Sequence, residues 1–227
     1  MLRKALFSLM LVAAATPGMS NGATPESAYS ALAGIYDIQP RSVYGEMLAH
    51  RKLYLAFTGD DVTGFFDNPY PQPDDADVDN TCRFFLSGKM TSGNRMDLVA
   101  TEFDSSTPTS QIALTKQHDG TWRVAVDGPR GHAADLPNCA VPSMVSGDVV
   151  KLADPRPWQI VGKIGTAKAP LYSEPSADKQ TRAYLIESDP VAIQITQGEW
   201  TQIDYIGKHR ELVRWARSSD LYYYLNR

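Results

Sequence analysis

The chain has 227 residues, of which 43% are hydrophobic, and its 22 Lys and Arg residues against 26 Asp and Glu residues give a formal net charge of −4 at pH 7. Nucleic acids and anionic lipid surfaces bind clustered Lys and Arg side chains, and the sequence contains no such cluster. The composition therefore excludes a basic nucleic-acid- or lipid-binding protein and indicates a globular chain with enough apolar residues for a core.

The first residues have the pattern of a cleaved signal peptide. Residues 2–4 are basic in character, and residues 5–15 form an apolar run that is shorter than the roughly 20 residues of a membrane span. We expect cleavage near Ala23, so the protein is predicted to be periplasmic or secreted, without a membrane span; an uncleaved N-terminal helix is the alternative. Removal of residues 1–23 takes away two basic residues and no acid, which changes the formal charge from −4 to −6.

From Gly34 to Leu152, short runs of Tyr, Phe, Val, Leu and Ile alternate with Gly, Asp, Asn and Pro, which is typical of antiparallel strands and turns. Tight turns are expected at Gly59–Gly64 and His118–Gly120. In Trp122–Asp127, apolar and polar residues alternate, as in a strand with one buried face. We predict an all-β fold, with an antiparallel β sandwich or small barrel over residues 34–152. The expected strands are Gly34–Ile38, Glu46–Phe57, Val62–Asp67, Cys82–Lys89, Met96–Phe103, Gln111–Lys116, Trp122–Val126 and Val149–Leu152.

The two cysteines, Cys82 and Cys139, are expected to form a disulfide, because exported proteins fold in an oxidising compartment. A loop of this length would stabilise the fold by about 4 kcal/mol in the chain-entropy interpretation. A free catalytic thiol is the alternative. We place no metal or cofactor on either cysteine.

The segment Tyr70–Asn80 is acidic and carries Asp74, Asp75, Asp77 and Asp79. The spacing of the last three is similar to the start of a calcium loop, but Asn80 and Leu86 stand where that loop needs glycine and glutamate. The segment is therefore interpreted as a solvated loop or as a charged arm that docks into the basic cleft of a partner.

A domain boundary is predicted at Ala153–Trp158, where two prolines in three residues remove donors from a strand ladder. The second domain is expected to span residues 158–227. Its core is predicted from apolar residues that recur at strand spacing. These residues are Leu171, Leu185, Val191, Ile193, Ile195, Ile203 and Val213, and Trp200 is also interpreted as a core residue.

Four segments of this second domain follow one another in a recognisable order. "APLYSEPS" (169–176) stands where a family has "LNVRSGPS", and "AYLIESDPV" (183–191) matches a strand, a Gly-Asp bend and a valine. "EWTQIDY" (199–205) matches a Trp-x-x-Val strand, and "VRWARSSDL" (213–221) a Gly-Trp-Val segment. In these segments the chain resembles the bacterial Src-homology-three-like family, a small five-stranded β barrel, although Glu174, Ser188 and Arg214 replace glycines of the pattern.

The resemblance implies recognition of cell-wall peptide, glycan or another protein rather than catalysis. Aromatic side chains offer a large contact area, so Tyr172, Tyr205 and Trp215 are candidates for a binding groove, with Glu174 in the adjoining turn. The terminal run Tyr222–Tyr224 is expected to be a last strand that packs across the second barrel or onto the first domain.

No catalytic or nucleotide-binding motif is present: the sequence lacks a Gly-x-Ser-x-Gly elbow, a His-Glu-x-x-His pair, a phosphate-binding loop and a dinucleotide fingerprint. The first hypothesis is a non-catalytic exported protein that recognises another protein, for example an immunity or inhibitor protein against an envelope-directed hydrolase. The second is a peptidoglycan-binding module. The third is a hydrolase that uses a carboxylate or His132.

Overall fold

The computed structural model describes residues 28–43, 46–48, 51–68, 82–103, 108–127, 144–207 and 212–224. Strands are the main secondary structure of these ranges, and the helices are three short 3₁₀ segments, so the predicted all-β class is confirmed. The ranges contain no helix that is long and apolar enough to cross a membrane. The first ten strands are β1 (Gly34–Ile38), β2 (Arg41–Val43), β3 (Glu46–Leu48), β4 (Lys52–Thr58), β5 (Asp61–Asn68), β6 (Cys82–Ser92), β7 (Arg95–Glu102), β8 (Pro108–Lys116), β9 (Trp122–Asp127) and β10 (Val149–Pro155). The others are β11 (Ile160–Ile164), β12 (Lys168–Tyr172), β13 (Gln180–Ile186), β14 (Pro190–Gln197), β15 (Trp200–Tyr205), β16 (Val213–Arg217) and β17 (Leu221–Tyr223), with short 3₁₀ helices at Ser30–Leu32, Ala177–Lys179 and Ser218–Asp220.

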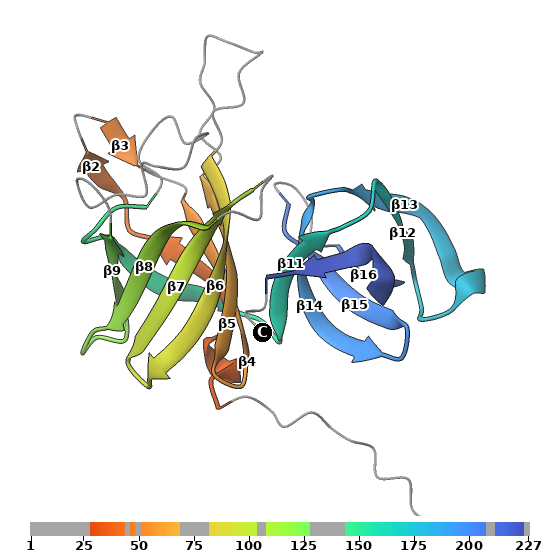
Figure 1. The fold of residues 1–227 in the computed structure, drawn as a ribbon, viewed down its shortest axis with the longest axis horizontal. Coiled ribbons are helices and arrows are strands. Elements are labelled where there is room, and N and C mark those ends of the chain that lie inside the picture. The colour runs from red at the N-terminus through yellow and green to blue at the C-terminus, as the bar shows by residue number, and fades with distance from the viewer. Residues whose placement is uncertain are drawn as a thin grey trace, which may run out of the picture.

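The first lobe is a closed antiparallel barrel, one of the two architectures that the sequence predicts. Its strand order is β1-β10-β9-β8-β7-β6-β5-β4, and β4 returns to β1 (Figure 1). β2 and β3 form a separate two-stranded hairpin. Because each barrel strand has a neighbour on both sides, the barrel has no free edge.

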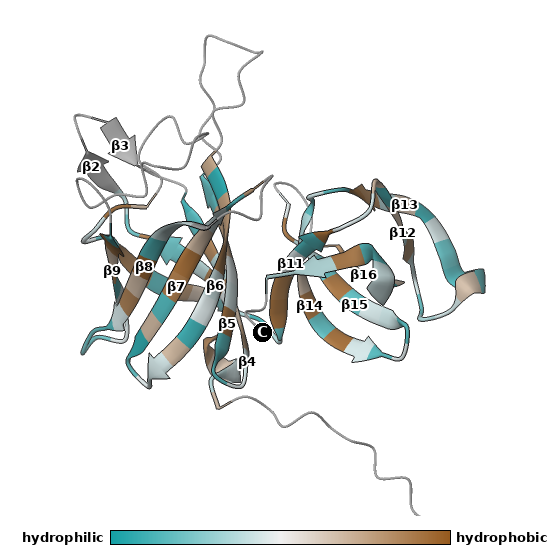
Figure 2. Cartoon of the chain, in the orientation of Figure 1, coloured by the Kyte–Doolittle hydropathy of each residue, from teal (hydrophilic) through white to brown (hydrophobic). Residues whose placement is uncertain are grey.

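Apolar and polar residues alternate along the barrel strands, and this alternation determines which side chains fill the interior (Figure 2). In β9, Trp122, Val124 and Val126 are buried while Arg123 and Asp127 are exposed, as the sequence predicts. In the ladder between β5 and β6, Phe66 lies opposite Phe84, and the two rings stack with centroids 4.7 Å apart. Such a filled interior makes the barrel a packed core rather than a channel.

On β5 and β6, both faces are buried. Phe84 and Phe85 are neighbours in sequence, so their side chains point to opposite faces of the sheet, yet both are 0% exposed. Phe85 lies beside Phe65, with ring centroids 5.1 Å apart, on the outer surface of the barrel. The outer face of these two strands must therefore be covered by the rest of the chain.

The second lobe provides that cover. It is a curled sheet of seven strands in the order β13-β12-β16-β15-β14-β11-β17, and β11 packs against β4 and β5 (Figure 1). The backbone N–H of Val161 donates to Thr63 Oγ1 at 2.7 Å, and Thr58 Oγ1 donates to the Gln159 carbonyl at 2.7 Å. Trp158 is 3% exposed and donates its indole N–H to Asp204 Oδ2 at 3.1 Å. The two lobes thus share a buried junction.

The core of the second lobe contains most of its predicted members. Leu171, Leu185, Val191, Ile193 and Ile203 are buried together. Ile195, however, is 40% exposed and Val213 is only partly buried. The β14–β15 ladder has a register shift between Ile193 and Ile195, which breaks the two-residue alternation from which Ile195 was predicted to be buried.

Most strands differ by a few residues from the expected bounds, and three differences have a structural reason. The predicted strand Glu46–Phe57 is two strands, β3 and β4, separated by a segment that ends at buried Arg51. Gly64 is not in a turn but in the middle of β5, opposite Leu55, where a Cβ would collide with the Leu55 side chain. β10 continues to Pro155, because this proline is the last residue of the ladder, opposite Gly34.

Candidate binding surface at the outer end of the second sheet

Two of the predicted groove residues, Tyr172 and Trp215, are directly opposite each other on β12 and β16. The ring of Tyr172 meets Trp200 edge-on, with centroids 4.7 Å apart. These three residues form a separate aromatic cluster, and each is at most 9% exposed. The burial agrees with the interpretation of Trp200 as a core residue, and it leaves little surface of Tyr172 and Trp215 for contact with a ligand.

Arg217 covers the Trp200 ring of this aromatic cluster. Its guanidinium carbon lies 3.9 Å from the centroid of the Trp200 ring, at the distance of a close cation–π contact. The same guanidinium forms an ion pair with Glu199. One face of Trp200 is therefore occupied by a side chain of the protein itself.

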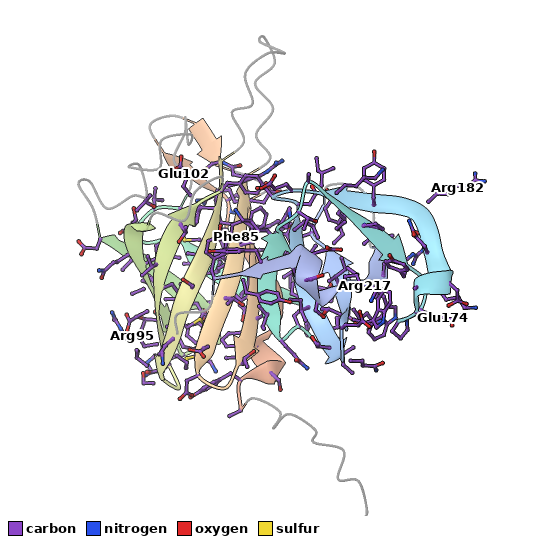
Figure 3. The ribbon with its side chains drawn as sticks, turned by 45° about the vertical axis from the view of Figure 1, so that its right-hand side comes forward. Phe85, Arg95, Glu102, Glu174, Arg182 and Arg217 are labelled. Carbon is purple, nitrogen blue, oxygen red and sulfur yellow. The ribbon has the colours of Figure 1, made fainter. Side chains whose placement is uncertain are left out.

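Glu174 lies in the connection between β12 and β13, with its side chain 62% exposed. It forms an ion pair with Lys179, N to O distance 3.9 Å. An exposed pair of this kind contributes about 0–1 kcal/mol. Figure 3 shows Glu174 at the end of the second lobe that is remote from the barrel.

Tyr205 lies elsewhere. It is five residues from Trp200 on β15, which corresponds to about 17 Å along a strand, and it pairs with Val191. Burial raises the pKa of the Tyr205 hydroxyl; the carboxylates of Asp189 and Asp67 raise it further, and the Arg83 guanidinium lowers it. Because Asp67 and Arg83 belong to the barrel, Tyr205 faces the junction between the lobes and is not part of the aromatic cluster.

The most exposed apolar side chains of the second lobe are on a different strand. Tyr184 and Ile186 of β13 are 52% and 53% exposed, whereas Leu185 between them is 5% exposed. Among the strands of the described residues, β13 is the terminal strand of its sheet and pairs with β12 alone. We call the residues Arg182–Ile186 the β13 edge.

Sequence reasoning missed the β13 edge as a candidate surface. A strand has only one buried face when its sheet is covered on one side, so the run Tyr184-Leu185-Ile186 cannot bury all three side chains. That apolar run was the available signal. Which face is buried depends on the position of β13 in the sheet, and strand order is not visible in the sequence.

Several predicted residues lie outside the described part of the chain: the signal segment 1–23, Asp74, Asp75, Asp77, Asp79, Cys139 and His132. Cys82 begins β6, is 1% exposed and is not a free thiol. Its pairing with Cys139 stays a prediction. Within the described ranges, no group of three or more His, Cys, Asp or Glu side chains is arranged to hold a metal ion.

No protein-family model matches the chain, and no curated protein matches it either.

Proposed function

We infer that the protein is a non-catalytic exported binding protein, which recognises another protein through the β13 edge. The observation that carries this proposal is the exposure of Tyr184 and Ile186, each more than half accessible, on a strand with one free side. An unpaired edge strand with exposed apolar side chains is a template for pairing with another chain. An immunity or inhibitor protein against an envelope-directed hydrolase remains the hypothesis for its biological class.

The geometry supports protein recognition over the alternative of peptidoglycan binding. Glycan binding by stacking requires an open aromatic face, and the candidates Tyr172 and Trp215 are almost fully buried. Trp200, their neighbour, has one face against Arg217. The β13 edge, in contrast, presents backbone polar groups together with apolar side chains, which is the combination used in recognition of extended polypeptides.

A crosslinking pull-down with the full chain from envelope extract tests the proposal, run beside sedimentation with purified sacculi. We expect one protein partner in stoichiometric amount. The double variant Tyr184→Ser/Ile186→Ser should reduce its capture at least about tenfold, because exposed hydrophobic anchors contribute most of the energy of such interfaces. The matched control is Ile195→Ser, which changes a 40% exposed isoleucine on β14. Binding to sacculi without a protein partner would contradict the proposal.

A further inference from the structure

The backbone of β13 directs hydrogen-bonding groups away from its sheet. In an antiparallel ladder, successive residues turn their N–H and C=O groups alternately toward one neighbour and toward the other. At the end of β13, the N–H of Ile186 donates to Asp189 Oδ2 at 2.8 Å, and its carbonyl accepts from the Asp189 N–H at 3.1 Å. The backbone N–H and C=O of Ile186 therefore point away from β12, and so do those of Tyr184, two residues earlier.

A second set of contacts gives the same orientation. The Thr181 hydroxyl accepts from the N–H of Ala183 at 3.2 Å and donates to the Leu171 carbonyl of β12 at 2.8 Å. The backbone N–H of Ala183 thus points toward β12, to which the Thr181 hydroxyl links it. Pro170, the residue opposite Tyr184, has no N–H to offer it. The N–H and C=O of Tyr184 consequently point to the open side of the strand.

The side chains of this edge have a definite charge. Arg182, Tyr184 and Ile186 alternate on the exposed face of β13, and Lys168 of β12 is opposite Ile186. The Lys168 ammonium lies 4.1 Å from the centroid of the Tyr184 ring. Figure 3 shows Arg182 extending from the end of the second lobe that is remote from the barrel.

Neither cation of this face has an acidic partner among the residues that the structure describes. The nearest acids in sequence, Asp178, Glu187 and Asp189, lie beyond the two ends of the β13 edge; Asp178 bonds to the Ser176 hydroxyl, and Asp189 accepts the Ile186 N–H. The side-chain face of this edge therefore presents two cations, Arg182 and Lys168, around an apolar centre, and the acids Glu187 and Asp189 follow at its end.

We propose that the β13 edge binds an extended, acidic polypeptide segment by strand addition. The segment pairs with the outward backbone groups at Tyr184, places carboxylates beside Arg182 and Lys168, and places apolar side chains on Tyr184 and Ile186. This inference rests on the proposed function and adds the chemistry of the partner. Main-chain pairing supplies affinity in such complexes, and side chains supply specificity.

A second copy of the chain fits this edge less well. Pairing of two β13 edges would bring Arg182 and Lys168 of one copy onto the same face as those of the other. Like charges in neighbouring strands are destabilising. The charge of the face thus favours a partner segment of opposite charge.

The test is an NMR titration of the full chain, labelled with ¹⁵N, with a capped ten-residue peptide of alternating valine and glutamate. We expect shifts of the amide signals of 182–185 and a dissociation constant about tenfold lower than for the same peptide with lysine in place of glutamate, because complementary charge sets specificity. A fully N-methylated glutamate peptide keeps its charges but cannot donate hydrogen bonds, so it should not bind. The variant Lys168→Glu/Arg182→Glu should reverse the preference, whereas Arg123→Glu, an exposed arginine on barrel strand β9, should not.

Equal binding of the two peptides, binding that survives N-methylation, or shifts confined to other strands would overturn the inference. Self-association that occupies the β13 edge would also overturn it. The pull-down separates this failure from that of the proposed function. A partner captured equally by the wild-type chain and by Lys168→Glu/Arg182→Glu leaves protein recognition standing and removes the acidic segment as its ligand, whereas no partner for the wild-type chain removes the proposed function itself.

Discussion

Every barrel strand has a paired neighbour on both sides, whereas the second sheet ends in two edge strands, β13 and β17. The β17 edge lies at the junction, because Tyr224, the residue after it, stacks on Phe85 of the barrel with ring centroids 4.9 Å apart. β13 lies at the opposite end of the sheet, away from the barrel (Figure 1). The difference indicates a division of roles, in which the barrel and junction provide a rigid base and β13 provides the surface for a partner.

Two arginines, one in each lobe, also have opposite environments. The barrel contains a fully buried pair, in which Arg51 donates to Asp148 Oδ2 at 2.6 Å and to Oδ1 at 3.1 Å. Asp148 Oδ2 also accepts the Val145 N–H at 2.9 Å. On β13 the arginine is exposed. A buried charge needs an oppositely charged side chain beside it, whereas a charge that binds another molecule must be exposed to solvent.

The largest effect is expected when this buried pair is broken. Asp148→Ala leaves the Arg51 guanidinium buried without its carboxylate, which costs about 3–5 kcal/mol. Urea unfolding of the full chain measures the change. Asp37→Ala is the control, because Asp37 pairs with Lys52 on the surface and should cost at most about 1 kcal/mol. Similar costs for the two variants would show that the barrel does not depend on the buried pair.

A second test compares neighbours on β13. Leu185→Ala removes a buried side chain from the core of the second lobe and should destabilise by about 2–5 kcal/mol. Ile186→Thr changes an exposed side chain and should stay within about 0.5 kcal/mol of the wild type. Thermal unfolding of both variants is the measurement. Equal losses would mean that Ile186 supports the fold and is not available to a partner.

Alkaline pH should weaken the junction side of the barrel. Burial raises the pKa of Tyr54 to about 12, with smaller contributions from the carboxylates of Asp67 and Asp37. The tyrosine ionises near pH 10 in the unfolded chain, so the stability that it contributes is fully present below pH 10 and is lost as pH rises toward about 12.

Tyr54→Phe should lose less stability between pH 9 and pH 11.5 than the wild type, measured by urea unfolding. The loss should not vanish, because burial also raises the pKa of Tyr36. Identical pH profiles for variant and wild type would contradict the assignment to Tyr54.

The smallest expected effect concerns the turn that ends β13. Ser188 has a φ of 70°, in the left-handed region that favours glycine. Ser188→Gly relieves this strain but increases the freedom of the unfolded chain, so we expect a gain of at most about 1 kcal/mol. Thermal unfolding would show a rise of a few degrees at most. A clear loss of stability would indicate that the Ser188 side chain has a role of its own.

The sequence predicted the strands better than their arrangement. β1 has its expected bounds, and β9 its expected buried face, because two-residue alternation is a local property. The covered outer face around Phe85 and the exposed face around Tyr184 depend on which strands are neighbours in space, which no local pattern reveals. The candidate residues Tyr172 and Trp215 were expected to line one groove, and they lie opposite each other, but both are buried in a cluster with Trp200, whose ring is in turn covered by Arg217.

Hydrogen–deuterium exchange of the free full chain, read at single amides, tests most directly whether β13 is an open edge. We expect the Tyr184 amide to exchange fast, and the amides of β6 in the barrel to be strongly protected, since exchange follows the hydrogen bonding of each N–H. Protection of Tyr184 equal to that of β6 would contradict the account, because it would mean that the outer side of β13 is already occupied.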